Sequence, residues 1–223
     1  HIEGLGYVPQ AVILQIMRKV KLENTKTSSD LTQLLHAYHI EQKTRQMLYF
    51  RLSIAAGTVI AASLAAKRYH TWDDATNSDL TKCYAPAISA TILWSILSFC
   101  FLIHESVSTF SQKAILTADA KKKQVKPPSM ASIKYGTAGG TVILNAKRTV
   151  GNLMEQTPIF LVGVWLHAVF VNPLSAAQIA WTWLAVRAFY PLVWGNLPWM
   201  FAVTLPNYCS IIALYWPLFS LLL

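Results

Sequence analysis

Charged residues are scarce in this chain, and two long segments have none. Lysine, arginine, aspartate and glutamate make up 13% of its 223 residues, whereas 54% are hydrophobic. No charged residue follows Arg187, and the segment 85–103 is likewise uncharged. Such runs are long enough to cross a hydrocarbon core of roughly 30 Å as helices. The scarcity of charge excludes an ordinary soluble domain and predicts an integral, multi-pass membrane protein.

The chain also lacks the cysteine spacings of zinc sites and disulfide frameworks. Its three cysteines, Cys83, Cys100 and Cys209, form no C-x-x-C pair, and two of them fall within expected spans. We therefore expect no metal site. There is no N-x-S/T sequence either, so the sequence gives no support to a glycosylated luminal face.

Acidic side chains are few compared with basic ones, 10 against 19, and the formal net charge is +9. The basic residues flank the apolar segments and form no nucleic-acid-binding motif, so we expect no nucleic-acid partner. The densest basic group comprises Lys121, Lys122, Lys123 and Lys126. We expect this group to lie on the membrane surface against anionic headgroups, with the lipid bilayer as its partner.

Five membrane-spanning helices are predicted from the apolar segments. They are expected over 47–66, 85–103, 147–172, 174–193 and 196–223. A polar, basic loop of residues 105–146 separates the second span from the third. Five spans place this loop on the same side of the membrane as residues 1–46. The prediction therefore agrees with the rule that positive charge is retained on one side.

Residues 1–46 mix short apolar stretches with charges. A helix is expected to open near Ser28, with apolar side chains at helical spacing, namely Leu31, Leu34, Leu35 and Tyr38. We predict an amphipathic, peripheral region on the membrane or on a partner. Because the chain begins with His1, we expect a processed precursor, and from this a mitochondrial membrane, with the endoplasmic reticulum as the alternative.

Two charged residues fall well inside expected spans, Glu155 in the third and Arg187 in the fourth. At about 1.5 Å per residue, both lie roughly 10 Å from the basic side, so we predict that they form a buried ion pair. Each belongs to a polar stripe on its helix: Arg148, Asn152 and Glu155, and Trp183, Arg187, Tyr190 and Trp194. Facing stripes could bind an anionic ligand or could form a structural polar seam.

The order of these polar residues resembles the signature of the MAPEG family, the membrane-associated proteins in eicosanoid and glutathione metabolism. The matching pattern is Arg148-x3-Asn152-x2-Glu155-x2-Pro158, then the turn Asn172-Pro173, then Arg187-x2-Tyr190. The resemblance covers about residues 85–223 and includes the long basic loop. The chain looks like a divergent member.

The resemblance implies an all-α membrane bundle of four helices over residues 85–223, to which residues 47–66 add one N-terminal transmembrane helix. It also implies a homotrimer that holds glutathione between protomers. The glutathione- or anion-binding positions that it implies are Arg148, Asn152, Glu155, Arg187 and Tyr190. It assigns no catalytic residue.

Two departures from the family pattern concern thiol chemistry. Catalytic members resemble one another in an arginine near the start of the last helix, which lowers the pKa of the glutathione thiol. Here the stretch 196–204 has no arginine or lysine, and Trp194 replaces a second tyrosine. We therefore expect a non-catalytic accessory or structural subunit of a membrane hetero-complex. We expect this subunit to bind a lipid. The cofactor that the resemblance suggests is glutathione. The alternative is a membrane-bound glutathione transferase or peroxidase acting on a lipophilic substrate.

Overall fold

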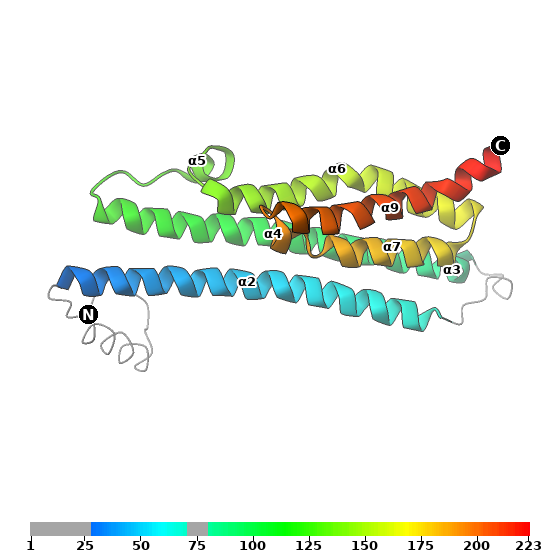
Figure 1. Cartoon of the computed structure of the whole chain (residues 1–223), viewed down its shortest axis with the longest axis horizontal. Coiled ribbons are helices and arrows are strands. Elements are labelled where there is room, and N and C mark those ends of the chain that lie inside the picture. The colour runs from blue at the N-terminus through cyan, green and yellow to red at the C-terminus, as the bar shows by residue number, and fades with distance from the viewer. Residues whose placement is uncertain (1–27, 71–79) are drawn as a thin grey trace. The chain divides into compact units, whose positions relative to one another are not determined.

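The computed structural model describes residues 28–70 and 80–223, and the regular structure in these residues is α-helix (Figure 1). This confirms the expected all-α class. The chain divides into two compact units after Met47. Residues 1–27, more than half of the expected peripheral region, lie outside the described residues, as does the connector 71–79.

The first described helix, α2, runs without a break from Ser28 to Arg68. It begins where the sequence placed a helix start, and it continues through the boundary expected at residue 46. No proline interrupts the segment, so nothing in it blocks helical hydrogen bonding. Its portion within the first unit carries the exposed ion pair Arg45–Glu41, at 2.7 Å.

Four helices in the described residues are long and apolar enough to cross a membrane. Their apolar stretches are Thr44–Arg68, Ala85–Lys122, Gly140–Phe170 and Leu197–Leu222. Large apolar side chains cover their outer faces, among them Phe99, 65% exposed, and Leu205, also 65% exposed. Water would disfavour so much exposed apolar surface, whereas acyl chains accommodate it. The multi-pass membrane prediction is therefore confirmed.

The basic loop expected over 105–146 is largely helical instead. After the short α3 (Leu80–Cys83), α4 extends from Ala85 to Lys122, and α5 covers Met130–Tyr135. No proline occurs between Pro86 and Pro127, so the helix continues past the end of its apolar run. The four lysines expected on the membrane surface are exposed at or just beyond the C-terminus of α4, where the helix dipole favours positive charge.

The expected single span over 174–193 is split in two. Helix α6 (Gly140–Phe170) leads through an Asn172 cap, whose side chain accepts a hydrogen bond from the Ser175 N–H at 2.7 Å, into α7 (Pro173–Arg187). A short helix α8 (Tyr190–Val193) follows, and then α9 (Leu197–Leu222). The Pro191 ring conflicts with the carbonyl four residues earlier, which belongs to Arg187, so α7 ends there. The break places Arg187 at a helix C-terminus.

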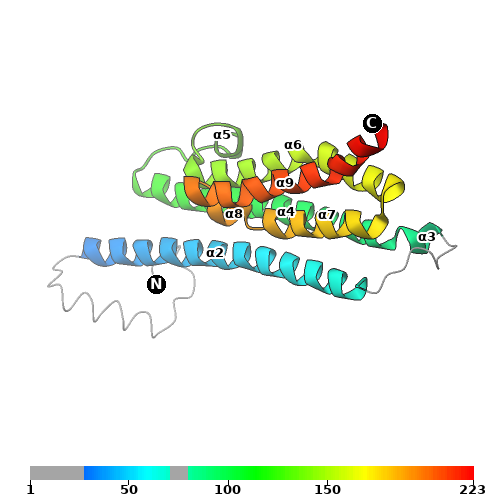
Figure 2. The same ribbon diagram turned by 45° about the vertical axis from the view of Figure 1, so that its right-hand side comes forward.

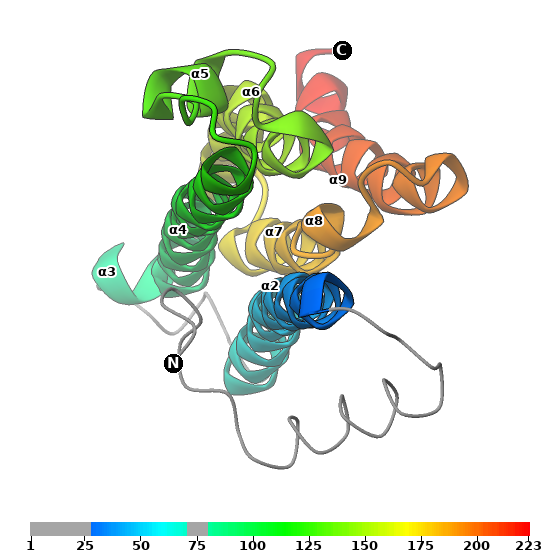
Figure 3. The ribbon, with the colours of Figure 1, turned by 90° about the vertical axis from the view of Figure 1, so that its left-hand side faces the viewer.

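Helices α4, α6, α7 and α9 pack together in the second unit (Figures 2 and 3). Helices α6 and α7 are antiparallel, since Phe160 stacks on Trp183 at 4.0 Å between ring centroids. Helices α6 and α9 run parallel and approach closely at Gly163, where a Cβ atom would lie 2.8 Å from the Tyr215 ring. These contacts determine which residues of α6, α7 and α9 lie at the same height along the bundle axis.

The part of α2 within the second unit packs on the bundle at two points. The Nε of Arg51 donates a hydrogen bond to Nε2 of His104 on α4, at 2.9 Å. At the other end of the helix, Tyr69 stacks on Trp181 of α7, with ring centroids 5.9 Å apart. Helix α2 therefore has specific contacts with both α4 and α7.

Candidate functional site

Arg187 is the central group of the candidate site. It is 1% exposed, and its guanidinium lies over the Tyr190 ring at 4.5 Å and the Trp183 ring at 5.9 Å. Its Nε and Nη2 are buried and have no hydrogen-bond partner among the residues that the structure describes. Burying a charged donor without an acceptor is expensive, and more so in a bilayer. The expectation that Arg187 is buried is confirmed, and two of its donors are free for an acceptor.

Tyr190 and Asn152 join α8 to α6 next to this guanidinium. The side-chain amide of Asn152 donates a hydrogen bond to the Tyr190 hydroxyl oxygen. The Asn145 amide also donates to the carbonyl of Pro191 at 3.5 Å. Because the Tyr190 oxygen already accepts, its own proton remains available for donation. The structure thus brings three predicted site residues together: Arg187, Tyr190 and Asn152.

Glu155 lies at the level of Arg187, as expected, but the predicted ion pair does not form within the chain. The contacts Phe160–Trp183 and Asn152–Tyr190 place residue 155 opposite residue 187 in the antiparallel pair. The Glu155 side chain is nevertheless exposed, and the ion pairs of the described residues do not include it. It acts on Arg187 only as a nearby charge. The prediction of a buried Glu155–Arg187 ion pair is therefore wrong for the single chain.

Helix phase explains why the pair is missing. The buried face of α6 carries Thr149, Leu153 and Phe160, which recur at helical spacing. Arg148 and Glu155 lie off this face and are exposed, while Asn152 is at its edge. At 100° per residue, the carboxylate points away from the core although its Cα lies at the right depth. Arg148 and Glu155 therefore flank the site from the outside, within electrostatic range of Tyr190.

Helix α9 contributes a residue that the sequence analysis missed. Asn207 is fully buried, and both its amide nitrogen and its amide oxygen lack partners in the described part of the chain. The close approach of Gly163 to Tyr215 sets α6 and α9 in parallel register, which puts Asn207 near the level of Glu155. Its neighbour Tyr208 interacts electrostatically with Arg187, which supports this placement. An isolated polar side chain inside an otherwise apolar span was the available signal.

Trp183, whose ring lies under the Arg187 guanidinium, and Gln156 on α6 also carry polar atoms without partners in the described part of the chain. These atoms are the buried indole N–H of Trp183 and the buried side-chain oxygen of Gln156. Buried polar groups in proteins are nearly always hydrogen-bonded, to protein, water or ligand. Unmet polar atoms also occur elsewhere among the described residues, at Trp94, His104, Ser108 and Trp181. A bound polar group is therefore favoured here chiefly by the two unmet donors of the Arg187 guanidinium.

The wall of the site is aromatic where the family pattern implied a second tyrosine. Trp194 lies next to Tyr190, with ring centroids 5.8 Å apart, and it offers an N–H donor but no acceptor. The half-buried Thr204 is the hydroxyl nearest in sequence to the missing arginine. The site therefore combines one guanidinium with neutral donors and aromatic rings.

Together these features define a multi-pass helical membrane protein with an unpaired arginine inside its bundle. The chain belongs to the MAPEG family, whose model matches residues 90–219, more than half of its length. The match begins in α4 and ends in α9, so α2 lies outside it. The suspected resemblance is thereby confirmed.

Among individual proteins, the chain is similar to an uncharacterized protein of Synechocystis. The two are 36% identical over 70 residues, which cover 29% of this chain and 50% of the relative. The chain thus spans about half the length of that relative. No solved structure matches the chain.

Proposed function

We propose that this chain is a non-catalytic MAPEG subunit that holds an anionic ligand of the glutathione class and serves as an accessory member of a membrane complex. One observation carries the proposal: the Nε and Nη2 of Arg187 have no partner in the described residues, while α9 supplies no cation to activate a thiol.

The geometry around Arg187 supports anion binding. A guanidinium can hold a carboxylate through two parallel hydrogen bonds, and such pairs are stronger where water is excluded. The Tyr190 hydroxyl and the exposed Arg148 add donors next to it. Glutathione carries two carboxylates and an amide backbone, so it suits a site with a cation, amide side chains and an apolar aromatic wall.

The composition of α9 argues against thiol activation. A thiolate becomes the favoured form when a positive charge lies next to it. The polar side chains that α9 can offer near the site, Thr204 and Asn207, are neutral, and no lysine or arginine follows Arg187 in the sequence. A bound thiol would then keep its proton, and conjugation would be slow.

The accessory role rests on what lies outside the family match. Helix α2 lies outside the family match and adds surface to the matched bundle. Arg148 and Glu155 are also exposed on α6, where a neighbouring subunit could cover them. A hetero-complex is our first proposal for the assembly and a homotrimer the alternative. A mitochondrial membrane is proposed as its location, with the endoplasmic reticulum as the alternative.

Two assays on the purified full chain test the ligand and the chemistry separately. The first measures equilibrium binding of glutathione to the wild type and to Arg187→Ala. The second measures conjugation of glutathione to a lipophilic electrophile by the same two proteins. We expect binding that the substitution abolishes, with no turnover above the uncatalysed rate. Absence of glutathione binding to the wild type would contradict the proposed ligand.

The alternative function, a membrane glutathione transferase or peroxidase, is favoured by the Asn152–Tyr190 hydrogen bond beside Arg187, since these are three of the five positions implied for holding glutathione. Turnover by the wild type that is lost in Arg187→Ala would establish this alternative and exclude the non-catalytic role.

The accessory role has its own test. Chemical cross-linking in native membranes, followed by purification in mild detergent, measures which proteins accompany the chain and in what ratio. A constant stoichiometry with one or more different membrane proteins is expected. Recovery of the chain only as a homotrimer would contradict the role of accessory subunit and leave the ligand proposal untouched.

A further inference from the structure

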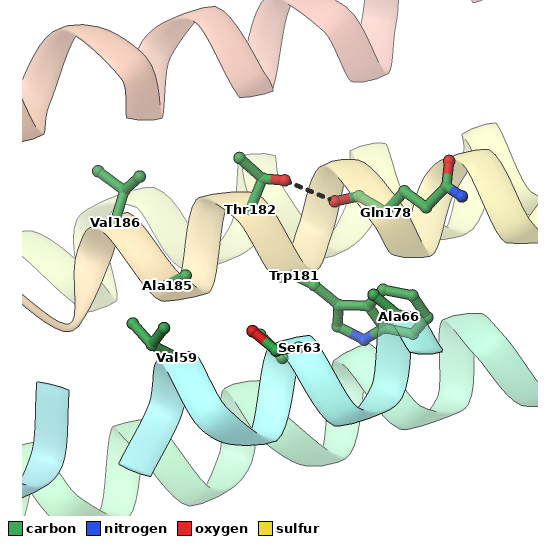
Figure 4. A pocket seen from close by; sticks show the side chains of 9 residues that line it. Val59, Ser63, Ala66, Gln178, Trp181, Thr182, Ala185 and Val186 are labelled. Atoms are coloured by element: carbon green, nitrogen blue, oxygen red, sulfur yellow. Dashed lines mark hydrogen bonds between the residues drawn. The ribbon is translucent and has the colours of Figure 1, made fainter. Parts of the chain in front are cut away.

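A groove lies between α2 and α7, and Arg187 is not among the residues that line it (Figure 4). Its volume is about 380 Å³, within the range of about 300–1,000 Å³ typical of ligand sites. It is lined by Val59, Ala62, Ser63, Ala66, Gln178, Trp181, Thr182, Ala185 and Val186. The α2 wall of this groove lies outside the family match, whereas its α7 wall lies inside it.

Small side chains leave the space between the two helices. Ala185 on α7 faces the part of α2 between Val59 and Ser63, while the indole of Trp181 lies against Ala66 at the other end of the groove (Figure 4). Thr182 uses its hydroxyl to donate to the Gln178 carbonyl at 2.9 Å, which leaves mainly apolar lining. A chain of methylene groups fits such a surface better than a polar ligand does.

The depth of the groove determines what it meets. Val59 to Ala66 belong to the apolar stretch Thr44–Arg68, which can span a membrane. The open side of the groove at that depth faces acyl chains and not water. Polar peptides and water-soluble ligands are therefore poor occupants.

One end of the groove carries positive charge. Lys67 and Arg68 directly follow Ala66 in the last turn of α2, and both are exposed. Neither enters an ion pair in the part of the chain that the structure describes. On the α7 side, the amide of Gln178 is also exposed at this end. Exposed basic residues at the end of a span attract anionic lipid headgroups.

We propose that the groove between α2 and α7 binds one acyl chain of an anionic phospholipid, with the phosphate held by Lys67 and Arg68. The lipid fills the space between α2 and the bundle and so helps to hold α2 in place. This site is separate from the one at Arg187 and does not depend on glutathione.

The test uses the full chain reconstituted into vesicles of equal parts phosphatidylglycerol and phosphatidylcholine, then extracted in mild detergent. Native mass spectrometry measures which phospholipid stays bound. We expect one retained phosphatidylglycerol per chain. Substitution of both basic residues, Lys67→Gln with Arg68→Gln, should lower the preference for phosphatidylglycerol by about fivefold per charge.

Filling the groove provides the matched comparison. Ala185→Phe and Ala66→Phe act from opposite walls and should each remove the retained lipid, whereas Ala213→Phe, at an exposed position on α9, should not. Helix content by circular dichroism identifies any variant that fails to fold. A phospholipid with a photoreactive acyl chain should label residues 59–66 and 178–186 of the wild type, and this result requires no variant.

Three results would overturn the proposal. The first is the absence of retained phospholipid on the wild type, and the second is equal retention by both filled variants and the control. The third is labelling of the groove residues no stronger than that of the rest of the apolar surface. If the lipid is retained without headgroup preference, the assignment of the phosphate to Lys67 and Arg68 is wrong.

Discussion

Two arginines lie at membrane depth in this molecule, and their surroundings differ. Arg51 on α2 is half-buried, and its Nε donates to a ring nitrogen of His104 at 2.9 Å. Arg187 on α7 is 1% exposed, lies over two aromatic rings, and keeps two donors without partners among the described residues. Within residues 28–70 and 80–223, neither arginine forms an ion pair with a carboxylate.

The difference separates a structural contact from a binding site. The Nε of Arg51 donates to a neutral acceptor and joins α2 to α4, while the other ring nitrogen of His104, Nδ1, is buried without a partner among the described residues. The Arg187 guanidinium is buried at a cost that the protein alone does not offset. A charge retained under those conditions is better explained by a ligand than by packing.

The largest effect is expected from Arg187→Met. Glutathione binding should weaken by about 30-fold or more, because loss of one partner from a buried charge pair costs on the order of 2–5 kcal/mol. The melting temperature of the ligand-free protein should stay the same or rise, since an uncompensated charge is replaced by an apolar side chain. Calorimetric titration and thermal unfolding in detergent measure the two quantities. Arg51→Met is the matched control and should leave glutathione binding intact. An equal loss of binding in both variants would contradict the assignment of the ligand site to Arg187.

Asn207→Leu should stabilise the ligand-free protein. The change removes an amide whose donor and acceptor are both unmet in the described structure, and each such group costs about 1–3 kcal/mol. Thermal unfolding of the purified chain gives the shift. The exposed Asn196→Leu provides the comparison and should change the melting temperature little. A lower melting temperature for Asn207→Leu would mean that the amide has partners in the free protein.

A smaller effect is expected from Tyr190→Phe, which keeps the ring over Arg187 and removes the hydroxyl. Loss of one neutral hydrogen bond costs about 1 kcal/mol, so glutathione binding should weaken by about fivefold. The control is Tyr49→Phe on α2, where the side chain is 63% exposed. Unchanged binding in Tyr190→Phe would remove the hydroxyl from the site and leave Arg187 as its main donor.

The smallest effect concerns the hydrogen bond between Arg51 and His104. A double-mutant cycle with Arg51→Met and His104→Phe should give a coupling of about 0.5–1.5 kcal/mol in the free energy of unfolding, the net value of a hydrogen bond. Glutathione affinity should be the same in all four proteins of the cycle. An affinity that follows this coupling would show that the two arginines act on one site.

Much of the fold was predictable because segments that span a membrane contain few charged residues. Uncharged runs identified the segments 85–103 and 196–223 as spans, and helices α4 and α9 cover them. The extension of α4 to Lys122 was missed, since hydropathy ends at His104 whereas helical hydrogen bonding continues until a breaker is reached. The break after Arg187 could have been read from Pro191, which lies four residues further on.

The sequence predicted the depth of the site residues in the membrane but not the direction in which the Glu155 side chain points. Counting residues placed Glu155 and Arg187 at one level, and the α6–α7 contacts support that level. Whether Glu155 faces α7 depends on which face of α6 is buried, and this follows from packing on three neighbouring helices. Asn207 was not predicted because the stretch in which the family pattern implies an arginine, 196–204, ends about one helical turn before it.

The central claim is that the site holds glutathione without activating its thiol. Ultraviolet difference absorbance of the bound ligand tests this most directly, because a thiolate absorbs where a thiol does not. At neutral pH and saturating glutathione, the account predicts bound ligand with no thiolate band. A thiolate band that appears on binding, and disappears in Arg187→Met, would contradict it.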